Sequence, residues 1–126
     1  MAEGNGDMYL LNDLNVSEHF KISEFKCNDG SQEIMLEYKL VKLLQKLRWV
    51  VGKPIKINSG YRTKTYNHKV GGSPRSQHLL GRAADIVVEG YTPSQIAELA
   101  DQLGFDGIGI YDTFCHVDVR GYKARW

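Results

Sequence analysis

The most informative stretch of the chain is SQHLLGRAADIVV, residues 76–88. Its second half, 83–88, is an apolar run of strand length, which predicts a buried β-strand. Asp85 lies inside this run, where burying a carboxylate is costly unless it is paired or bound to a metal. His78 ends the loop before the strand, and Gly81 permits a close backbone approach that brings the two side chains together. The stretch therefore predicts a polar site beside a buried strand.

A second polar cluster stands in CHVDV, residues 115–119. Polar and apolar residues alternate there, which predicts a strand with His116 and Asp118 on one face. Two histidines and one carboxylate, with a fourth position left to water, are the ligand set of a catalytic zinc ion. Taken singly, the three residues have ordinary alternatives: His78 as a loop residue, Asp85 as a cap or salt-bridge partner, and His116 as a half-buried histidine. From the residues alone both interpretations stay open.

The rest of the chain predicts an α+β domain on a small, mainly antiparallel sheet packed with helices. Apolar residues at three- and four-residue spacing predict a long helix over 32–51. Thr92, Pro93 and Gln95 predict a capped helix that ends near Leu103. The other predicted elements are a short helix and turn at 17–25, a long loop or broken helix at 61–80, and strands at 55–58, 83–88, 107–111 and 116–119. A loop as long as 61–80 tends to be functional.

Composition and charge exclude several classes of protein. The 126 residues are 42% hydrophobic and 25% charged, which is typical of a single soluble globular domain. With 16 basic and 15 acidic residues the formal net charge is +1, so the chain has no basic footprint for nucleic acid. No apolar run is long enough to span a membrane. We expect a monomer that binds neither nucleic acid nor membrane.

The cysteines and the N-terminus lead to three further expectations. Cys27 and Cys115 stand in unrelated contexts, so we expect two buried free thiols and no disulfide scaffold. Residues 1–15 predict a poorly ordered N-terminal leader, and 16–126 a single domain. The N-terminus has no basic region followed by an apolar one, so we expect no signal peptide and synthesis in the cytoplasm.

Four segments resemble a known family. The pattern SxHxxGxAxD at 76–85, with HVD at 116–118, resembles the zinc signature of the D-Ala-D-Ala carboxypeptidase family of metallopeptidases. SGYRT at 59–63 and GIGIY at 107–111 are similar to the branch found in phage lysins and bacterial cell-wall enzymes. The likeness covers about 16–126. It implies the fold shared by hedgehog and DD-peptidase domains, a Zn²⁺ cofactor, and hydrolysis of peptide bonds in peptidoglycan by a D,D-carboxypeptidase or an endopeptidase.

Carried over residue by residue, the resemblance implies zinc ligands at His78, Asp85 and His116. The family's substrate-binding arginine falls on Arg62, whose guanidinium can hold a carboxylate or an oxygen that becomes anionic in the transition state. Many members place an acid three residues before the last histidine ligand. This sequence has Thr113 there, so the general base of the family is not in its usual place.

The general base and the residues around the ligands are therefore separate predictions. Asp112 is the nearest acid upstream of His116 and is the candidate base, with a turn-forming aspartate as the alternative. We expect Asp118 to orient a histidine ligand by accepting its ring N–H, and Ser76 either to do likewise or to cap the loop. The displaced base keeps an alternative function open: a non-catalytic zinc domain that binds wall peptide or a protein partner. A lysin without a signal peptide would reach the cell wall by phage-type release.

Overall fold

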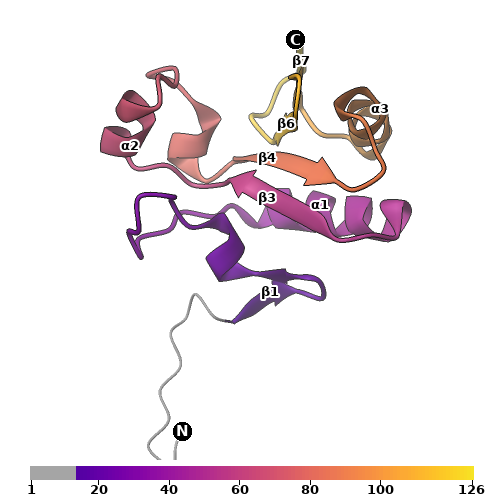
Figure 1. Cartoon of the computed structure of the whole chain (residues 1–126), viewed down its shortest axis with the longest axis horizontal. Helices are drawn as coiled ribbons and strands as arrows, with labels where there is room; N and C mark the ends of the chain where they lie inside the picture. Colours follow the sequence, from indigo (N-terminus) through magenta and orange to yellow (C-terminus); the bar gives the residue numbers. More distant parts are fainter. Residues whose placement is uncertain (1–13) are drawn as a thin grey trace, which may run out of the picture.

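A five-stranded sheet forms the centre of the computed structural model, which describes residues 14–126 (Figure 1). The strand order is β3-β4-β6-β5-β7, and every neighbouring pair is antiparallel except β5 and β7. The predicted α+β class with a mainly antiparallel sheet is confirmed. The strands are β3 (Ile55–Ser59), β4 (Ala83–Val88), β5 (Gly107–Ile110), β6 (Cys115–Asp118) and β7 (Ala124–Arg125).

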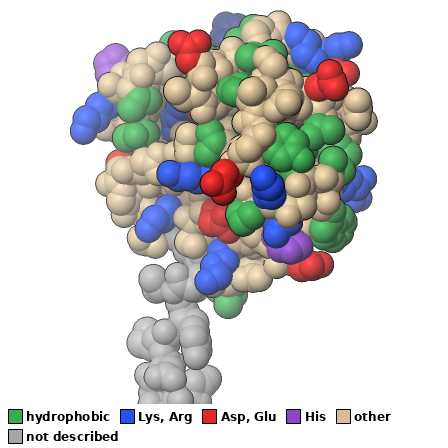
Figure 2. All heavy atoms as spheres, turned by 45° about the vertical axis from the view of Figure 1, so that its right-hand side comes forward, with side chains coloured by type: hydrophobic (Ala, Val, Ile, Leu, Met, Phe, Trp, Pro, Cys, Tyr) green, Lys and Arg blue, Asp and Glu red, His purple; other side chains and the backbone are tan. Residues whose placement is uncertain are grey.

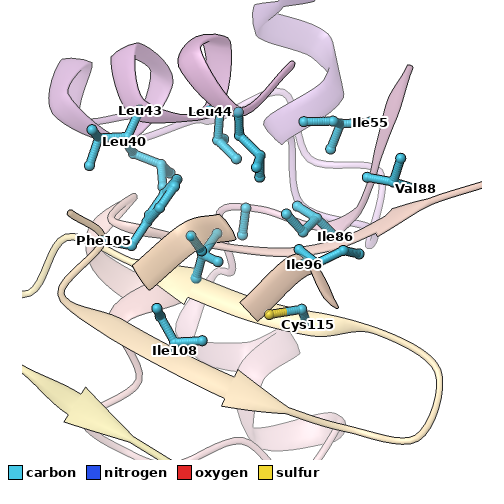
Figure 3. Packing of buried hydrophobic residues seen from close by; sticks show 14 of the residues in the cluster. Leu40, Leu43, Leu44, Ile55, Ile86, Val88, Ile96, Phe105, Ile108 and Cys115 are labelled. Carbon is cyan, nitrogen blue, oxygen red and sulfur yellow. The ribbon is translucent and has the colours of Figure 1, made fainter. Parts of the chain in front are cut away.

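Helices α1 (Tyr38–Val51) and α3 (Pro93–Leu103) form the hydrophobic core together with the sheet. Figure 3 shows apolar side chains of both helices meeting those of the strands. Fully burying one leucine or isoleucine side chain stabilises the fold by about 1.5–3 kcal/mol. Buried members from these elements include Leu40, Leu44, Leu47, Ile86, Ile96, Ala100, Ile108 and Val117.

Alternate residues of the sheet divide between this core and the opposite face, as the pleat of a strand requires. Ala84 and Ile86 belong to the core, and so does Val117, the register partner of Ala84. Asp85 and His116 lie between these positions and are partners in the β4–β6 ladder. The sheet therefore presents these two polar residues together on the face away from the core.

Two predicted elements are found with their expected ends. Strand β4 covers 83–88 as predicted. In α3, Thr92 and Gln95 form the capping box, with Pro93 in the first turn and Gly104 closing the helix in the left-handed region. Both signals are local, which is why the sequence predicts these ends well. The predicted strands at 55–58 and 107–111 differ from β3 and β5 by one residue at the C-terminal end, and the predicted strand at 116–119 is shifted by one residue from β6.

The predicted start of the long helix at residue 32 is wrong, because α1 begins at Tyr38. The backbone N–H of Glu37 donates to the carbonyl of Gly81 at 2.9 Å. A Cβ at Gly81 would lie only 2.1 Å from the carbonyl oxygen of Met35, so the two backbones are in close contact. This contact holds the chain before Tyr38 extended, and the helical spacing of the sequence cannot reveal it.

The predicted helix and turn at 17–25 is only partly right. A hairpin of β1 (Asn15–Ser17) and β2 (Phe20–Lys21) comes first, and the 3-10 helix η2 (Ile22–Phe25) follows. The side chain of Gln45 on α1 holds this hairpin, because its Oε1 accepts from the Ser17 hydroxyl and from a hairpin backbone N–H. Of the predicted leader over 1–15, residues 1–13 lie outside the described residues.

The predicted long loop or broken helix at 61–80 contains the short helix α2 (Lys64–Lys69) and the 3-10 helix η3 (Gln77–Leu80). Both cysteines are free and buried, as expected. Among residues 14–126, no helix is long and apolar enough to cross a membrane. Figure 2 shows basic and acidic side chains interspersed over one face, in keeping with the balanced charge.

Candidate metal centre

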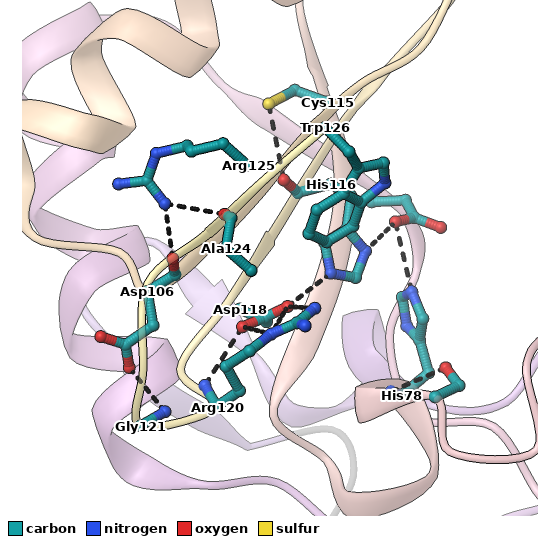
Figure 4. Close-up of polar contacts among 12 residues, drawn as sticks. His78, Asp106, Cys115, His116, Asp118, Arg120, Gly121, Ala124, Arg125 and Trp126 are labelled. Carbon is teal, nitrogen blue, oxygen red and sulfur yellow. Dashed lines mark hydrogen bonds and ion pairs between the residues drawn. The ribbon is translucent and has the colours of Figure 1, made fainter.

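Three buried side chains from three elements converge on the face of the sheet away from the core: His78 from η3, Asp85 from β4 and His116 from β6. Nε2 of His78 lies 3.2 Å and Nδ1 of His116 lies 3.0 Å from the same oxygen, Oδ1 of Asp85. One potential ligand atom from each residue falls within 4.8 Å of the others. The structure thus brings together the three residues that the sequence predicts as metal ligands, and Figure 4 shows the two histidines among them.

His78 is held by its local backbone. Ser76 caps η3, its hydroxyl accepting from the backbone N–H of His78 at 3.2 Å. Gly81 ends η3 in the left-handed region, with φ of 68°, so the chain turns at once into β4. The ring nitrogen Nδ1 of His78 lies 2.7 Å from the carbonyl oxygen of Gly60. Because a carbonyl only accepts, Nδ1 carries the proton and donates.

His116 is held by the side chain two residues after it. Its Nε2 lies 2.7 Å from Oδ2 of Asp118, which is fully buried and accepts this N–H. Arg120 donates to both carboxylate oxygens of Asp118 and lies with its guanidinium carbon 5.0 Å from the ring of Trp126. The Trp126 ring lies 5.0 Å from the ring of His116. Asp118 therefore has the position that a residue orienting His116 needs.

Two glycines of β5 make room on this face of the sheet. A Cβ at Gly109 would lie 2.5 Å from the indole of Trp126, and one at Gly107 would lie 2.2 Å from the carboxylate of Asp118. Gly109 is the register partner of His116, and Gly107 that of Asp118. The segment GIGIY thus has glycines where the side chains of Trp126 and Asp118 lie against β5.

The protonation of the two rings makes the centre attractive to a cation. His78 donates from Nδ1 and His116 from Nε2, so in their neutral forms both rings direct a lone pair at the Asp85 carboxylate. Facing lone pairs repel one another unless positive charge stands between them, either as added protons or as a metal ion. Two nitrogens and one carboxylate oxygen form a ligand set that fits Zn²⁺.

The pKa values reflect the same crowding of groups. Burial raises the pKa of the Asp85 carboxyl, but hydrogen bonds to His116 and His78 and the charges of these rings outweigh burial, so the pKa lies below its ordinary range. The pKa of Asp118 is lowered in the same way, against burial, by His116 and Arg120. Burial lowers the pKa of His116, but its two carboxylate partners raise it above its ordinary value of 6.5.

Arg62 lies beside the centre, where its guanidinium contacts Asp85. Its NH2 nitrogen is 3.3 Å from Oδ2 of Asp85, its Nε donates to the hydroxyl of Ser59, and its NH1 donates to Oδ1 of Asn67. At least three of its five N–H donors thus have partners within the chain. Asn67 is buried, and its Nδ2 also donates to the carbonyl of Ser73. The sequence analysis missed Asn67, because an asparagine on a short helix carries no distinctive signal.

Asp112 lies on the turn between β5 and β6 and is exposed. Its neighbours Tyr111 and Phe114 line the cleft at the metal centre, whereas Asp112 does not. Its carboxylate has no hydrogen bond or ion pair with any residue of 14–126. The structure therefore does not bring the candidate base to the ligands, although it sits between two residues that reach the cleft.

The metal centre opens into a cleft of about 740 Å³. Its walls include arginines and aromatic side chains, and Asp85 is the sole acid lining it among the described residues. The residues of this kind are Arg62, Arg75, Arg120, Tyr111, Phe114, Tyr122 and Trp126. The ligand face of the site is thus reachable from outside, as a site that acts on a large substrate requires.

Comparison with known proteins places the chain in a family. The family model described as Peptidase M15 matches residues 18–119. The zinc D-Ala-D-Ala carboxypeptidase of Streptomyces albus G is 39% identical over 87 residues, which cover 66% of this chain and 34% of that enzyme. The peptidoglycan L,D-endopeptidase MepK of Escherichia coli K12 is 28% identical over an alignment of 131 positions, which covers 97% of this chain and 69% of that enzyme. This chain therefore spans about a third of the length of the first relative. Because the family model matches most of the sequence and includes all three converging residues, this chain belongs to the Peptidase M15 family.

Proposed function

We propose that this chain is a zinc peptidase that hydrolyses peptide bonds in peptidoglycan stem peptides or cross-links. Membership of a peptidase family supports the reaction, and the names of the two relatives support zinc and the wall substrate. The observation that carries the proposal is the convergence of two histidine nitrogens on one carboxylate oxygen, at 3.0 and 3.2 Å. Three ligands with an open side are typical of a catalytic zinc site, whereas structural sites are closed by four.

His78, Asp85 and His116 would hold the metal. When bound there, Zn²⁺ supplies a Lewis acid that polarises a carbonyl and activates a water for attack. The chain's own groups fix the ligands: the Gly60 carbonyl holds the His78 ring, and Asp118 holds the His116 ring with Nδ1 toward the site. These contacts set the metal-binding nitrogens in advance, which lowers the cost of ordering them on binding.

Proton transfer is assigned in this proposal to Asp112. Asp118 is fully buried and already accepts from His116 and Arg120, so it is poorly placed to take a proton from the cleft. The carboxylate of Asp112 has no partner within residues 14–126, and it lies on a turn whose other residues Tyr111 and Phe114 line the cleft. A shift of this turn on substrate binding would bring it to the reacting atoms, as general-base catalysis requires.

Two finer proposals concern the setting of the activity. We propose that residues 16–126 form the peptidase domain and that the chain acts as a lysin at the bacterial cell wall after phage-type release. The likeness of SGYRT and GIGIY to the lysin branch supports this setting. D-Ala-D-Ala, L-Ala-D-Glu and cross-bridge bonds are all compatible with one ligand set.

The decisive experiment is digestion of defined muropeptides by zinc-loaded protein, with products identified by mass spectrometry. We expect one new amine per cleaved bond, no products from metal-free protein, and none from His116→Ala. Zinc content is measured in parallel, so that loss of metal and loss of chemistry are separated. Stoichiometric zinc without products from any muropeptide would contradict hydrolysis.

The second candidate is a zinc domain that binds wall peptide without cleaving it. The observation that favours it is that neither Asp112 nor Asp118 directs a free carboxylate into the cleft. This candidate predicts saturable, zinc-dependent binding of muropeptides that are recovered intact.

A further inference from the structure

The charged side chains of the cleft are unequally distributed. Of residues 14–126, three arginines line it, Arg62, Arg75 and Arg120, against one acid, Asp85. This local excess contrasts with the net charge of +1 for the whole chain. A cleft with surplus positive charge attracts anionic groups, and the guanidinium fork matches a carboxylate in geometry.

Two of the three arginines already have carboxylate partners within the protein. Arg62 contacts Asp85 at 3.3 Å, and Arg120 donates to Asp118 at 2.7 Å. Arg75 differs, because its guanidinium has no hydrogen bond or ion pair with any residue of 14–126 and its side chain is exposed. It is therefore the cleft arginine that is free to bind an anion from solution.

The backbone that carries Arg75 is fixed to the metal centre. Asn67 donates from Nδ2 to the backbone carbonyl of Ser73 at 2.8 Å, and the backbone carbonyl of Asn67 accepts from the backbone N–H of Gly72. A Cβ at Gly72 would lie 2.1 Å from Oδ1 of Asn67, so the loop lies directly on this side chain. Next to Arg75 on the other side, Ser76 caps the helix that bears a metal ligand. The loop is thus anchored on both sides of Arg75.

We propose that Arg75 is a specificity-determining residue that binds a free carboxylate of the peptide substrate. The proposal deepens the function given above and rests on it for the identity of the substrate. A stem peptide offers such a group in two places, the α-carboxyl of its γ-linked glutamate and its C-terminal carboxyl. Both present the same planar anion, and a guanidinium can hold either by two parallel hydrogen bonds.

The test uses one zinc-loaded protein and three forms of a stem pentapeptide: all carboxyls free, the glutamate α-carboxyl amidated, or the C-terminus amidated. Affinity is Kd by calorimetry for peptides that stay intact and KM from initial rates for those that are cleaved. We expect one amidation to weaken binding to the unmodified protein by about fivefold to tenfold, as loss of a charge-assisted hydrogen bond does. In Arg75→Gln we expect this preference for the free carboxylate to disappear, so that the free and amidated forms bind alike.

Two further variants make the result specific. Arg75→Lys keeps the charge without the fork, so we expect part of the preference to return. Lys69→Gln removes a positive charge from an exposed residue of α2 that does not line the cleft, and should keep the full preference. The preference should also shrink with added salt, since the contact is exposed.

The proposal is overturned if Arg75→Gln distinguishes free from amidated peptides as the unmodified protein does, or if Lys69→Gln loses the preference equally. Which amidation matters identifies the carboxylate. Failure of the proposed function has a different signature: peptides bound with the Arg75-dependent preference but recovered intact would refute hydrolysis and keep the carboxylate contact.

Discussion

Nε2 of His116 lies 2.7 Å from Oδ2 of Asp118, so the nitrogen that remains for a metal is Nδ1. The pleat of β6 produces this pairing, because residues two apart on a strand share a face. His116 and Asp118 are therefore one unit, in which the carboxylate fixes both the tautomer and the angle of the ring.

The first prediction concerns Asp118→Asn, which keeps the side-chain volume and removes the charge that holds His116. We expect zinc affinity to fall by about 10- to 100-fold, as is typical when a group that orients a histidine ligand is changed. Competition with a chelator of known affinity measures it. The matched control is Asp101→Asn, which removes an acid paired with Arg125 that contacts none of the three ligands. Equal zinc affinity in both variants would contradict the role of Asp118.

The second prediction concerns Gly109, which leaves space for the indole of Trp126. In Gly109→Ala the new Cβ would lie 2.5 Å from that ring, so the ring must move. We expect a loss of about 1–3 kcal/mol in the free energy of unfolding, the usual cost of overpacking. Because the ring packs on His116, zinc affinity should fall as well.

A double-mutant cycle checks the cause of this loss. Removing the indole in Trp126→Ala should make Gly109→Ala nearly neutral for stability, so the two substitutions would be strongly non-additive. Additive effects in denaturant unfolding would mean that the Cβ disturbs something other than the indole.

The third prediction is that metal-free and zinc-loaded protein respond to pH in opposite directions. In the metal-free protein the pKa of His116 is raised above 6.5. A raised pKa means that protonated His116 stabilises the fold, fully below pH 6.5, and that this contribution is lost as the pH rises through the raised value. Zinc requires unprotonated nitrogens at His78 and His116, so its stabilising effect grows as the pH rises.

Thermal unfolding between pH 5 and 8, with zinc and with chelator, checks this pair of trends. The difference in Tm between the two conditions should be small at pH 5 and increase toward pH 8. A difference that does not change with pH would mean that the metal is not bound through the two histidines.

Much of the centre could be predicted from the sequence because its signals are local. Asp85 is anomalous inside an apolar strand, and the alternation around His116 places it on a face with Asp118. The ends of α3 follow from Thr92, Pro93 and Gln95 for the same reason.

What could not be predicted depends on contacts between distant segments. The start of α1 is set by Gly81, more than thirty residues along the chain, and the hairpin at the N-terminus by Gln45. Asn67 joins Arg62 to the loop before η3 through side-chain hydrogen bonds that no periodicity reveals. The carboxylate partners of Arg62 and Arg120 likewise appear only in three dimensions, and within residues 14–126 they leave Arg75 as the cleft arginine without a carboxylate partner.

The last prediction concerns Asp112, on which the choice between peptidase and binding domain depends. If it accepts the proton, Asp112→Asn should lower kcat by about 10²–10⁴-fold while zinc content stays stoichiometric, because the residue contacts none of the ligands. Thr113→Ala is the matched control on the same turn, since it changes a neighbouring polar residue without removing a carboxylate. Full activity in Asp112→Asn would exclude it as the base, and proton transfer would then have to occur without an acidic side chain of the turn.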